Sequence, residues 1–260
     1  MQHKGEMKVK VIDTHAHLDE LNDLEQAIYR AAKAGVSTII AVSIDINSCK
    51  KTLAIAETYS RESLKVYPAL GVHPSSALEE NVEEALEFVS ENSKRIVAVG
   101  EVGLDFWLKE ARRNEEVRRR QENVFCRFLE LAKNHSKPVL IHSRGAWERA
   151  YELVKGYDIE KAVFHWFSGP ENVLKDILDS GYYISATPAA EYSKAHREAV
   201  MKTPLERIVL ETDCPVRYKD EESEPIFVLK TLRAVAEIKE VEAVEVAKQT
   251  TKNALHIFEL

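Results

Sequence analysis

The 260-residue sequence has few cysteines and no long hydrophobic run. Its three cysteines, Cys49, Cys126 and Cys214, are widely spaced and form no CxxC pair, which argues against a disulfide framework and against a zinc site built from thiolates. No apolar run approaches the roughly 20 residues that a membrane span needs, and the N-terminal MQHKGEMK lacks the apolar core of a signal peptide. We therefore expect a cytoplasmic protein with reduced cysteines and no membrane contact.

The sequence also lacks an excess of positive charge. Its 43 acidic residues outnumber its 36 lysines and arginines, and the formal net charge is -7. Proteins that bind nucleic acid over a broad surface normally recruit basic residues, so a polyanionic substrate would have to be attracted locally. The densest basic cluster, KEARRNEEVRRR at residues 109–120, is interrupted by glutamates, and we interpret it as a solvated, salt-bridged helix face.

The remaining composition is that of a protein with one large core. Hydrophobic residues make up 45% of the chain and charged residues 30%, in the usual range for a folded domain of this length. The sequence shows no linker, low-complexity tract or second core pattern. We predict a short disordered lead over residues 1–7 and a single domain over residues 8–260.

Short runs of β-forming residues alternate with amphipathic helical patterns from Lys8 onward. Most of these runs are continuously apolar, as in a parallel sheet that is covered by helices on one side and filled on the other. Strands are expected within residues 9–19, 37–44, 65–74, 95–105, 137–144, 161–169, 182–187 and 207–213. Helices are expected over residues 24–34, 48–61, 81–92, 114–134, 145–155, 171–180, 191–202, 226–239 and 242–257.

Eight consecutive strand and helix units predict an α/β fold of the TIM (β/α)8 barrel type. The alternative is an open doubly wound sheet, but the first strand is not followed by a Gly-rich turn of the GxGxxG or GxxxxGK kind. In a TIM barrel the active site lies at the carboxyl ends of the strands. Polar residues at those ends are therefore the most informative about function.

Ionisable side chains gather at these strand ends. Side chains alternate along a strand, so Asp13, His15 and His17 of the first strand share a face. Two imidazoles on one face can bind one divalent ion, although a hydrogen-bonded pair of histidines explains this motif equally well. The ends of later strands add His73, Glu101, His142, His165 and Asp213.

A metal centre explains this set of residues better than separate structural roles do. Each residue alone could be a capping carboxylate, a hydrogen-bonded histidine or polar filling of the barrel mouth. Burying all of them in one pocket is costly, and a divalent ion compensates because it favours both neutral imidazole and ionised carboxylate. The set exceeds the three protein ligands of one tetrahedral ion, so we expect two ions about 3.5–4 Å apart, with Glu101 as the bridge and His73 facing the substrate.

Six motifs carry a family resemblance: DTHAHLD, GVHP, GEVGLDFW, KPVLIHSR, HWFSG and ETDCP, in that order. Over residues 11–258 the sequence resembles the TatD-type metal-dependent deoxyribonucleases, a branch of the amidohydrolase superfamily. The resemblance implies a TIM barrel and a magnesium-dependent nuclease that trims DNA from the 3′ end. It also implies that His15, His17 and Asp213 hold one ion, that His142 and His165 hold the other, and that Glu101 is shared.

The sequence departs from the family pattern outside this ligand set. Arg127 stands where a second glutamine is common, Trp166 where cysteine is common, and Ser223 where asparagine is common. The loop that follows Asp213 is also short. These changes concern the pocket wall rather than the metal chemistry, so they bear on substrate preference.

We expect hydrolysis of a DNA phosphodiester by water held at two divalent ions, either Mg, Mn or Zn, since a metal lowers the pKa of its water toward ~7. Asp213 is placed to accept the water's proton, and Glu101 holds the ions. His73 and Arg144 are candidate phosphate contacts, although a salt bridge at the barrel mouth explains Arg144 equally well. The expected partner is a single-stranded or frayed 3′ end of DNA, and no obligate protein partner is evident.

Two other functions fit parts of the same pattern. An amidohydrolase acting on a lactone, cyclic amide or aminoacyl ester would use similar ligands, and the net charge of -7 mildly favours it. A catalytically idle scaffold or nucleic-acid-binding module would not need the complete ligand set. Phe106, Trp107, Trp166 and Phe167 lie near the expected site and could stack on nucleobases, although we expect core packing for at least half of them.

Overall fold

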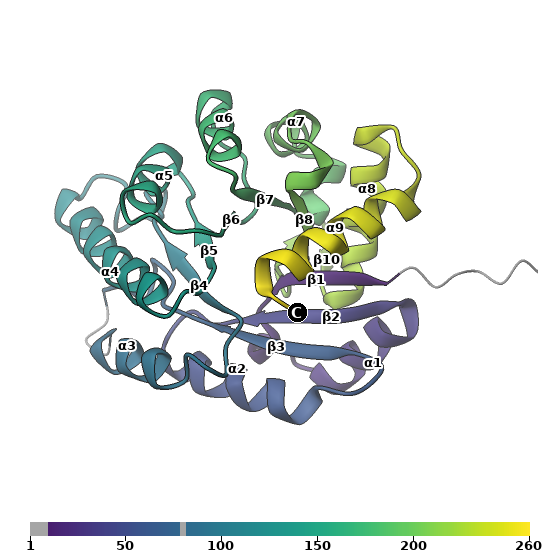
Figure 1. The fold of residues 1–260 in the computed structure, drawn as a ribbon, viewed down its shortest axis with the longest axis horizontal. Helices are drawn as coiled ribbons and strands as arrows, with labels where there is room; N and C mark the ends of the chain where they lie inside the picture. The colour runs from purple at the N-terminus through teal and green to yellow at the C-terminus, as the bar shows by residue number, and fades with distance from the viewer. Residues whose placement is uncertain (1–9, 79–81) are drawn as a thin grey trace, which may run out of the picture.

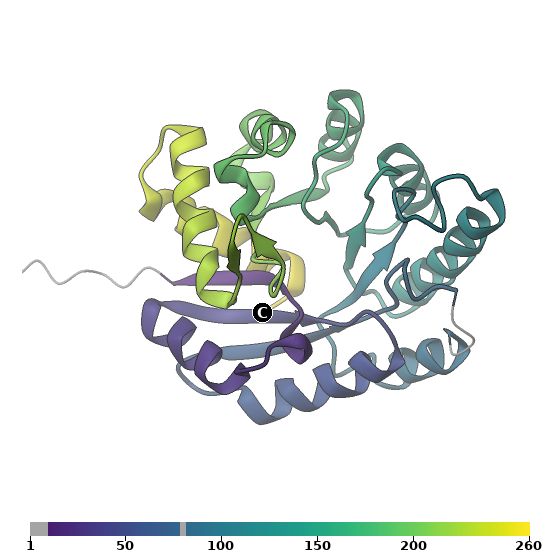
Figure 2. The ribbon, with the colours of Figure 1, turned by 180° about the vertical axis from the view of Figure 1, so that it is seen from behind.

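The chain folds into a barrel of parallel strands ringed by helices (Figures 1 and 2). This is a computed structural model, and it describes residues 10–78 and 82–260. The lead predicted over residues 1–7 lies outside the described residues. Neighbouring strands pair in sequence order: β1 (Val11–Ala16), β2 (Val36–Val42), β3 (Lys65–Leu70), β4 (Ala98–Gly103), β5 (Val139–His142), β6 (Ala162–Phe164), β7 (Tyr183–Ala186) and β8 (Ile208–Leu210).

Helices link the strands and cover the outside of the barrel (Figure 1). Within the described residues, none is long and apolar enough to cross a membrane. All three cysteines are free thiols. The helices are α1 (Leu24–Ala34), α2 (Ile46–Tyr59), α3 (Val82–Glu91), α4 (Glu115–Asn134), α5 (Trp147–Gly156), α6 (Glu171–Asp179), α7 (Lys194–Lys202), α8 (Val228–Lys239) and α9 (Ala243–Phe258).

Capping side chains decide where some of these helices begin. At α2, the carboxylate of Asp45 accepts a hydrogen bond from the N–H of Ser48 (2.7 Å), and the hydroxyl of Ser48 accepts one from the N–H of Asp45 (2.8 Å). This reciprocal pair is a capping box, and it starts the helix two residues before the expected residue 48. At α4, the side chain of Asn114 accepts hydrogen bonds from the first turn and fixes the start at Glu115.

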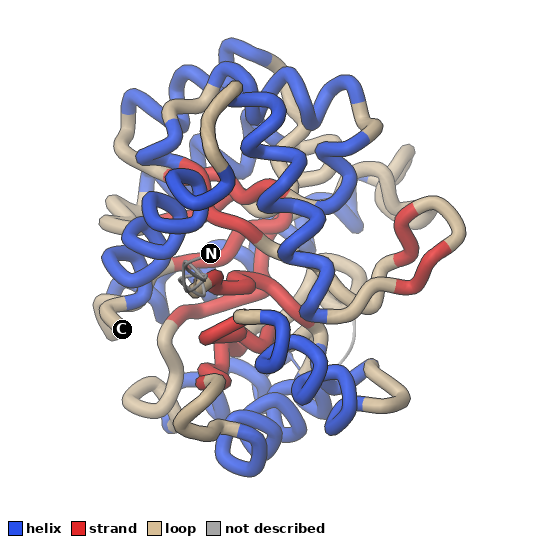
Figure 3. The backbone as a smooth tube through the Cα atoms, turned by 90° about the vertical axis from the view of Figure 1, so that its right-hand side faces the viewer, coloured by secondary structure: helices blue, strands red, loops and turns tan. Residues whose placement is uncertain are grey.

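The predicted TIM barrel is confirmed, and all eight expected strands are present. Their expected carboxyl ends were wrong in places, because the strand expected over residues 65–74 ends at Leu70 and the one over residues 161–169 ends at Phe164. The residues beyond these ends leave the ladder and bond to neighbouring loops, as when the N–H of His73 donates to the carbonyl of Ile44 (2.9 Å). The sequence patterns also missed a hairpin, β9 (Arg217–Tyr218) with β10 (Glu221–Glu222), which projects from one side (Figure 3).

The interior of the barrel is filled by apolar side chains from every strand. Helix α9 adds its last turns to this cluster, and Asn253 of α9 donates to the carbonyls of Leu205 (2.9 Å) and Ile208 (2.7 Å), at the amino end of β8. The helix therefore seals the amino-terminal end of the barrel and leaves the carboxyl end open. The interior cluster contains Ile12, Ile40, Val42, Ala69, Ala98, Leu140, Val163, Tyr183 and Val209 of the strands, and Ala254, Ile257 and Phe258 of α9.

A larger apolar cluster lies between the strands and the surrounding helices. Strand β2 shows the alternation, because Ile40 and Val42 belong to the interior cluster while Ile39 and Ala41 belong to the outer one. Both faces of the strands are thus buried, which explains their continuously apolar sequences. The polar residues at the carboxyl ends stand out against this background.

Strands β1 and β8 close the barrel without a regular ladder between them in the described residues. Instead, the carboxylate of Asp13 accepts hydrogen bonds from the N–H and the hydroxyl of Thr212, at 2.9 and 2.7 Å. The N–H of Asp213 donates to the carbonyl of His15 (2.9 Å). This seam places the segment after β8 directly beside the histidines of β1.

Candidate metal centre

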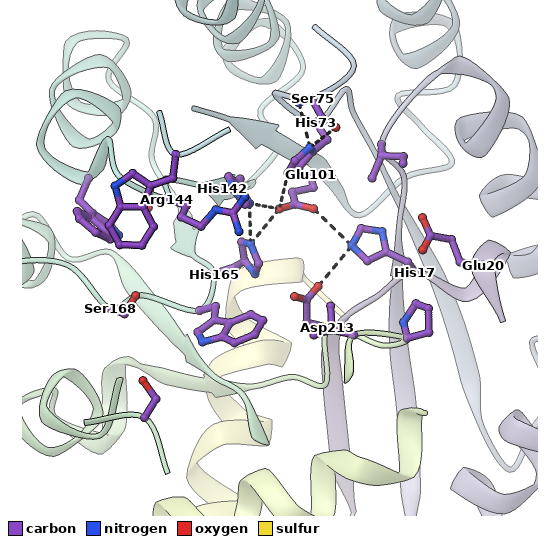
Figure 4. A pocket seen from close by; sticks show the side chains of 18 residues that line it. His17, Glu20, His73, Ser75, Glu101, His142, Arg144, His165, Ser168 and Asp213 are labelled. Atoms are coloured by element: carbon purple, nitrogen blue, oxygen red, sulfur yellow. Dashed lines mark hydrogen bonds and ion pairs between the residues drawn. The ribbon is translucent and has the colours of Figure 1, made fainter. Parts of the chain in front are cut away.

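A cavity of about 720 Å³ opens at the carboxyl ends of the strands (Figure 4). Its wall contains ionisable side chains from opposite sides of the barrel. His15 is fully buried and contacts two of these side chains from below the surface of the cavity. Of the ionisable residues singled out from the sequence, those that line the cavity are His17, His73, Glu101, His142, Arg144, His165 and Asp213.

The carboxylate of Glu101 divides its two oxygens between two pairs of histidines. Figure 4 shows its contacts with His17, His142 and His165. Its Oε2 lies 3.3 Å from Nε2 of His15 and 3.5 Å from Nε2 of His17. Its Oε1 lies 2.7 Å from Nδ1 of His142 and 2.9 Å from Nε2 of His165. A single carboxylate from β4 therefore contacts nitrogen pairs from the carboxyl end of β1 on one side and from the carboxyl ends of β5 and β6 on the other.

Asp213 joins the first of these groups. Its Oδ1 lies 3.5 Å from Nε2 of His15 and 3.4 Å from Nε2 of His17. The residue follows β8 in a left-handed conformation (φ 50°), and the seam bond to the carbonyl of His15 holds it there. Two imidazole nitrogens thus face two carboxylate oxygens, one from Asp213 and one from Glu101.

Two carboxylates that the sequence patterns did not single out, Asp105 and Glu211, orient the second histidine pair. Nε2 of His142 donates to Oδ2 of Asp105 (3.0 Å), and Nδ1 of His165 donates to Oε1 of Glu211 (3.2 Å). A neutral histidine that donates one N–H to a carboxylate presents the lone pair of its other nitrogen, which is the usual arrangement of a metal-binding histidine. In both residues that other nitrogen faces Glu101.

The signal for these two residues was present in the sequence. Asp105 follows Glu101 by four residues, and Glu211 precedes Asp213 by two. Alternation along a strand puts residues at such spacings on one face, which is the same reasoning that grouped His15 with His17. From these two strand ends the expected site took only Glu101 and Asp213, and so it missed both.

The electrostatics of this cluster fit a divalent cation. Both ring nitrogens of His15 are buried and form no hydrogen bond with the described residues. Burial lowers the pKa of His17, but the hydrogen bond to Asp213 and the charge of Glu101 outweigh burial and raise that pKa to about 9. The carboxylates therefore attract positive charge into a buried site, and a divalent ion can replace the protons as their partner. Imidazole nitrogen and carboxylate oxygen suit Zn, Mn or Mg.

His73 presents an N–H group to the cavity. The N–H of Ser75 donates to Nδ1 of His73 (3.1 Å), so in the neutral ring Nε2 carries the hydrogen. Burial lowers the pKa of His73 to about 3, which keeps the ring neutral at physiological pH. Its Nε2 lies 3.9 Å from Oε1 of Glu101, farther than the nitrogens of the second histidine pair. The ring is thus placed as a hydrogen-bond donor at the edge of the cluster.

Arg144 forms the salt bridge that was one of its two expected roles. Its Nε and Nη2 donate to Oδ2 of Asp105, at 2.9 and 2.7 Å. The side chain is nevertheless 52% exposed and lines the cavity. The bridge therefore fixes the guanidinium at the rim, where it can contact a bound anion, while Asp105 also orients His142.

The three departures from the family pattern lie in different places. Arg127 pairs with Glu83 on the outer surface, between α4 and α3. The hydroxyl of Ser223 donates to the carbonyl of Val216 (2.6 Å) and steadies the loop that carries the hairpin. Only Trp166 lines the cavity itself.

Comparison with known proteins identifies the family. The family described as TatD related DNase matches residues 12–259, which is nearly the whole described chain. The chain belongs to the TatD-related DNase family. This TatD-family chain is 31% identical to "Deoxyribonuclease TATDN3" of Homo sapiens, over 96% of the chain and 95% of that protein. It is also 31% identical to the "Uncharacterized metal-dependent hydrolase YabD" of Bacillus subtilis, over 96% and 99%.

Solved structures agree with this assignment. The crystal structure of YjjV, a TatD homologue from Escherichia coli, is 28% identical, has a TM-score of 0.87, and covers 98% of this chain and 100% of its own. A hydrolase of the TatD family from Entamoeba histolytica shares the fold, with a TM-score of 0.83 at 24% identity, over 95% of this chain and 97% of its own. The TatD-family chain is a metal-dependent hydrolase.

Proposed function

We propose that this TatD-family hydrolase is a deoxyribonuclease that holds two divalent ions and removes nucleotides from the 3′ end of single-stranded or frayed DNA. The split of Glu101 between two histidine pairs supports this proposal most strongly. A carboxylate with nitrogen donors at each oxygen is suited to bridge two ions, the arrangement of many phosphoesterases. One ion would be held by His15, His17 and Asp213 and the other by His142 and His165, with Glu101 shared.

The ions and the side chains would have separate tasks. Bound divalent ions would lower the pKa of water toward ~7 and offset negative charge at the phosphate. Burial raises the pKa of Asp213, but the hydrogen bond from His17 holds it below its usual range, so the carboxylate is ionised and can accept the proton of the attacking water. The N–H of His73 and the guanidinium of Arg144 would hold the phosphate oxygens.

The bond changes follow from attack in line with the leaving oxygen. Water adds to the phosphorus of the terminal nucleotide, and the bond from that phosphorus to the 3′ oxygen of the preceding nucleotide breaks. The leaving oxygen takes up a proton, and the product is a mononucleotide with a 5′ phosphate. A shorter strand with a new 3′ hydroxyl remains, and it is a substrate for the next cycle.

The charge of the protein bears on the form of the substrate. With a net charge of -7, the surface as a whole gives duplex DNA little attraction, so the ions and Arg144 must supply positive charge locally. A single-stranded or frayed end can enter the cavity with its phosphate directed at the ions, whereas a closed duplex end is wide and stiff. We place this activity in the cytoplasm, without an obligate protein partner.

The proposal is tested with end-labelled DNA. Metal-loaded protein is incubated with single strands labelled at the 3′ or the 5′ end, with and without chelator. We expect labelled mononucleotides from the 3′-labelled strand, progressively shorter products from the 5′-labelled strand, and no cleavage with chelator. Glu101→Gln should be inactive, and the matched surface control Glu130→Gln, at an exposed position of α4, should be fully active.

Two results would contradict the proposal. If metal-loaded protein leaves the labelled strands intact but opens a lactone or cleaves an aminoacyl ester, the amidohydrolase alternative is correct. If the protein binds its ions and hydrolyses none of these substrates, the chain is a scaffold.

A further inference from the structure

All three tryptophans of the chain line the cavity of the candidate metal centre. Trp107 follows β4, Trp147 begins α5 after β5, and Trp166 follows β6. They therefore come from three successive connections on the same side of the barrel mouth. Tryptophans that serve only core packing would lie in the core and not all beside the ionisable cluster.

Trp107 and Trp147 form a pair, and a glycine beside each ring leaves the space that the ring occupies. Their rings meet edge to face, with centroids 5.4 Å apart and an interplanar angle of 86°. A Cβ on Gly145 would lie 2.4 Å from the ring of Trp107, and a Cβ on Gly169 would lie 2.5 Å from the ring of Trp147. Any residue larger than glycine at either position would push an indole out of place.

Trp107 is exposed although Trp147 and Gly145 pack against its ring. Its side chain is 54% exposed, while Phe167 is fully buried and belongs to the core. Arg118 rests on the ring of Phe106, 4.7 Å from its centroid, and also donates to the carbonyl of Ala111 (2.9 Å). These contacts support the loop after β4, which carries the exposed indole of Trp107 at the cavity.

Trp166 is held on the wall by its backbone. Its φ of 43° is a left-handed conformation that is unfavourable for a bulky residue. Its N–H donates to the hydroxyl of Ser185 (2.8 Å) and to Oε1 of Glu211 (3.1 Å), the same oxygen that accepts from His165. The indole packs against Tyr218 with centroids 5.5 Å apart. One oxygen of Glu211 therefore orients His165, a candidate metal ligand, and also holds the backbone of Trp166 next to it.

We propose that Trp107, Trp147 and Trp166 form a stacking wall for the unpaired nucleobase of the nucleotide whose phosphate lies at the ions. This inference rests on the proposed nuclease function and names what its substrate must carry: a base that is free to stack. Every base has a π face, so such a wall selects unpaired nucleotides with little preference among sequences. A base held in a duplex has both faces and its pairing edge engaged, and it cannot reach the wall.

The substrate test compares two single strands that differ only at the 3′ end. One ends in deoxyadenosine and the other in an abasic nucleotide with the same phosphate. We expect wild-type kcat/KM to be higher for the deoxyadenosine end by roughly ten-fold or more, because stacking on aromatic side chains contributes that much per base. Trp107→Ala should bring the ratio of the two values close to one, and Trp107→Phe should restore most of it.

Matched variants keep this test decisive. Trp147→Phe keeps an aromatic ring beside Gly169 and should keep most of the wild-type ratio. Tyr29→Ala removes an exposed aromatic ring on α1, away from the cavity. We expect Tyr29→Ala to keep the wild-type ratio. The inference is overturned if the wild-type enzyme does not distinguish the two ends, or if Trp107→Ala changes both values in equal proportion.

A binding measurement separates this inference from the nuclease proposal. Because every tryptophan lines the cavity, the tryptophan fluorescence of the metal-loaded protein, excited at a wavelength that tyrosine does not absorb, reports on this site alone. We expect dAMP to quench it at a concentration at least ten-fold lower than deoxyribose 5-phosphate does. Equal quenching by the two compounds would contradict the stacking wall even if the enzyme cuts DNA. Selective quenching by dAMP without DNA cleavage would support the stacking wall and contradict the nuclease proposal.

Discussion

Oδ2 of Asp105 accepts a hydrogen bond from Nε2 of His142 at 3.0 Å and contacts Nη2 of Arg144 at 2.7 Å. One buried carboxylate therefore sets the tautomer of a candidate metal ligand and anchors a candidate phosphate contact. Burial raises the pKa of Asp105, but the hydrogen bonds from His142 and Arg144 outweigh it and lower the pKa to about 2, so the group is ionised at neutral pH. The metal centre and the rim of the cavity are coupled through it.

Asp105→Asn should weaken metal binding without unfolding the protein. The substitution replaces the charged acceptor of His142 by a neutral and weaker amide oxygen, and changes of this kind typically cost about 10–100-fold in metal affinity. The measurement is metal affinity by competition with a chelating dye. Asp158→Asn, an exposed aspartate paired with Lys133, is the control and should bind as the wild type does. An unchanged affinity in Asp105→Asn would show that the negative charge of Asp105 has no role in metal binding.

His73→Ala should impair turnover while leaving metal content intact. The ring donates from Nε2 into the cavity and is not among the nitrogens nearest to Glu101, so its loss removes a phosphate contact and no ligand. A hydrogen bond to a charged group contributes about 1.5–3 kcal/mol, which corresponds to a fall of roughly 10–100-fold in kcat/KM. Elemental analysis of the same preparation checks the metal. A loss of metal from His73→Ala would mean that His73 is a ligand.

Metal binding at pH 7 should release protons. Without a bound ion, the pKa of His17 is raised to about 9 and the pKa of His165 is raised well above its usual value. Burial lowers both values, but the negative charges of Glu101 and the neighbouring carboxylates outweigh burial. Both rings are therefore protonated at pH 7, and an ion must displace these protons to bind. Calorimetric titration with metal in two buffers of different ionisation enthalpy measures the release. Heats that do not depend on the buffer would contradict these shifts.

Phe258→Ala should destabilise the protein without changing its chemistry. The side chain belongs to the interior cluster at the amino end of the barrel, away from the cavity, and loss of a buried phenyl ring typically costs about 3–5 kcal/mol. Leu255→Ala on the same helix is the control, because an exposed position changes stability by only about 0.5 kcal/mol. Denaturant unfolding measures both. Metal content per folded chain should be that of the wild type, and a loss of metal from Phe258→Ala would show that α9 supports the site.

Much of the fold and the candidate ligand set could be predicted from the sequence because both depend on local patterns. Continuous apolar runs indicate parallel strands, and polar residues where those runs stop, such as Glu101 and His142, indicate the open end of a barrel. The positions where strands end were harder, because residues such as His73 leave the ladder for bonds to another loop. Those bonds depend on tertiary contacts that a local pattern does not contain.

Other features depend on residues far apart in the chain. The seam between Asp13 and Thr212 joins positions 199 residues apart, and neither residue has a spacing that indicates the other. Trp147 fell at the start of an expected helix, where an aromatic residue indicates core packing, and only the fold brings it against Trp107. The glycines that make room for these rings, at positions 145 and 169, follow other strands and showed no pattern of their own.

The most direct test of the two-ion proposal is the metal content and activity of Glu101 variants beside the wild type. Glu101 contacts both histidine pairs, so the proposal requires that its loss affect both ions. Elemental analysis should find two ions per wild-type chain and a fall in both occupancies in folded Glu101→Ala and Glu101→Gln. Neither variant should hydrolyse 3′-labelled single strands. A folded Glu101→Ala protein that retains two ions and normal turnover would contradict it.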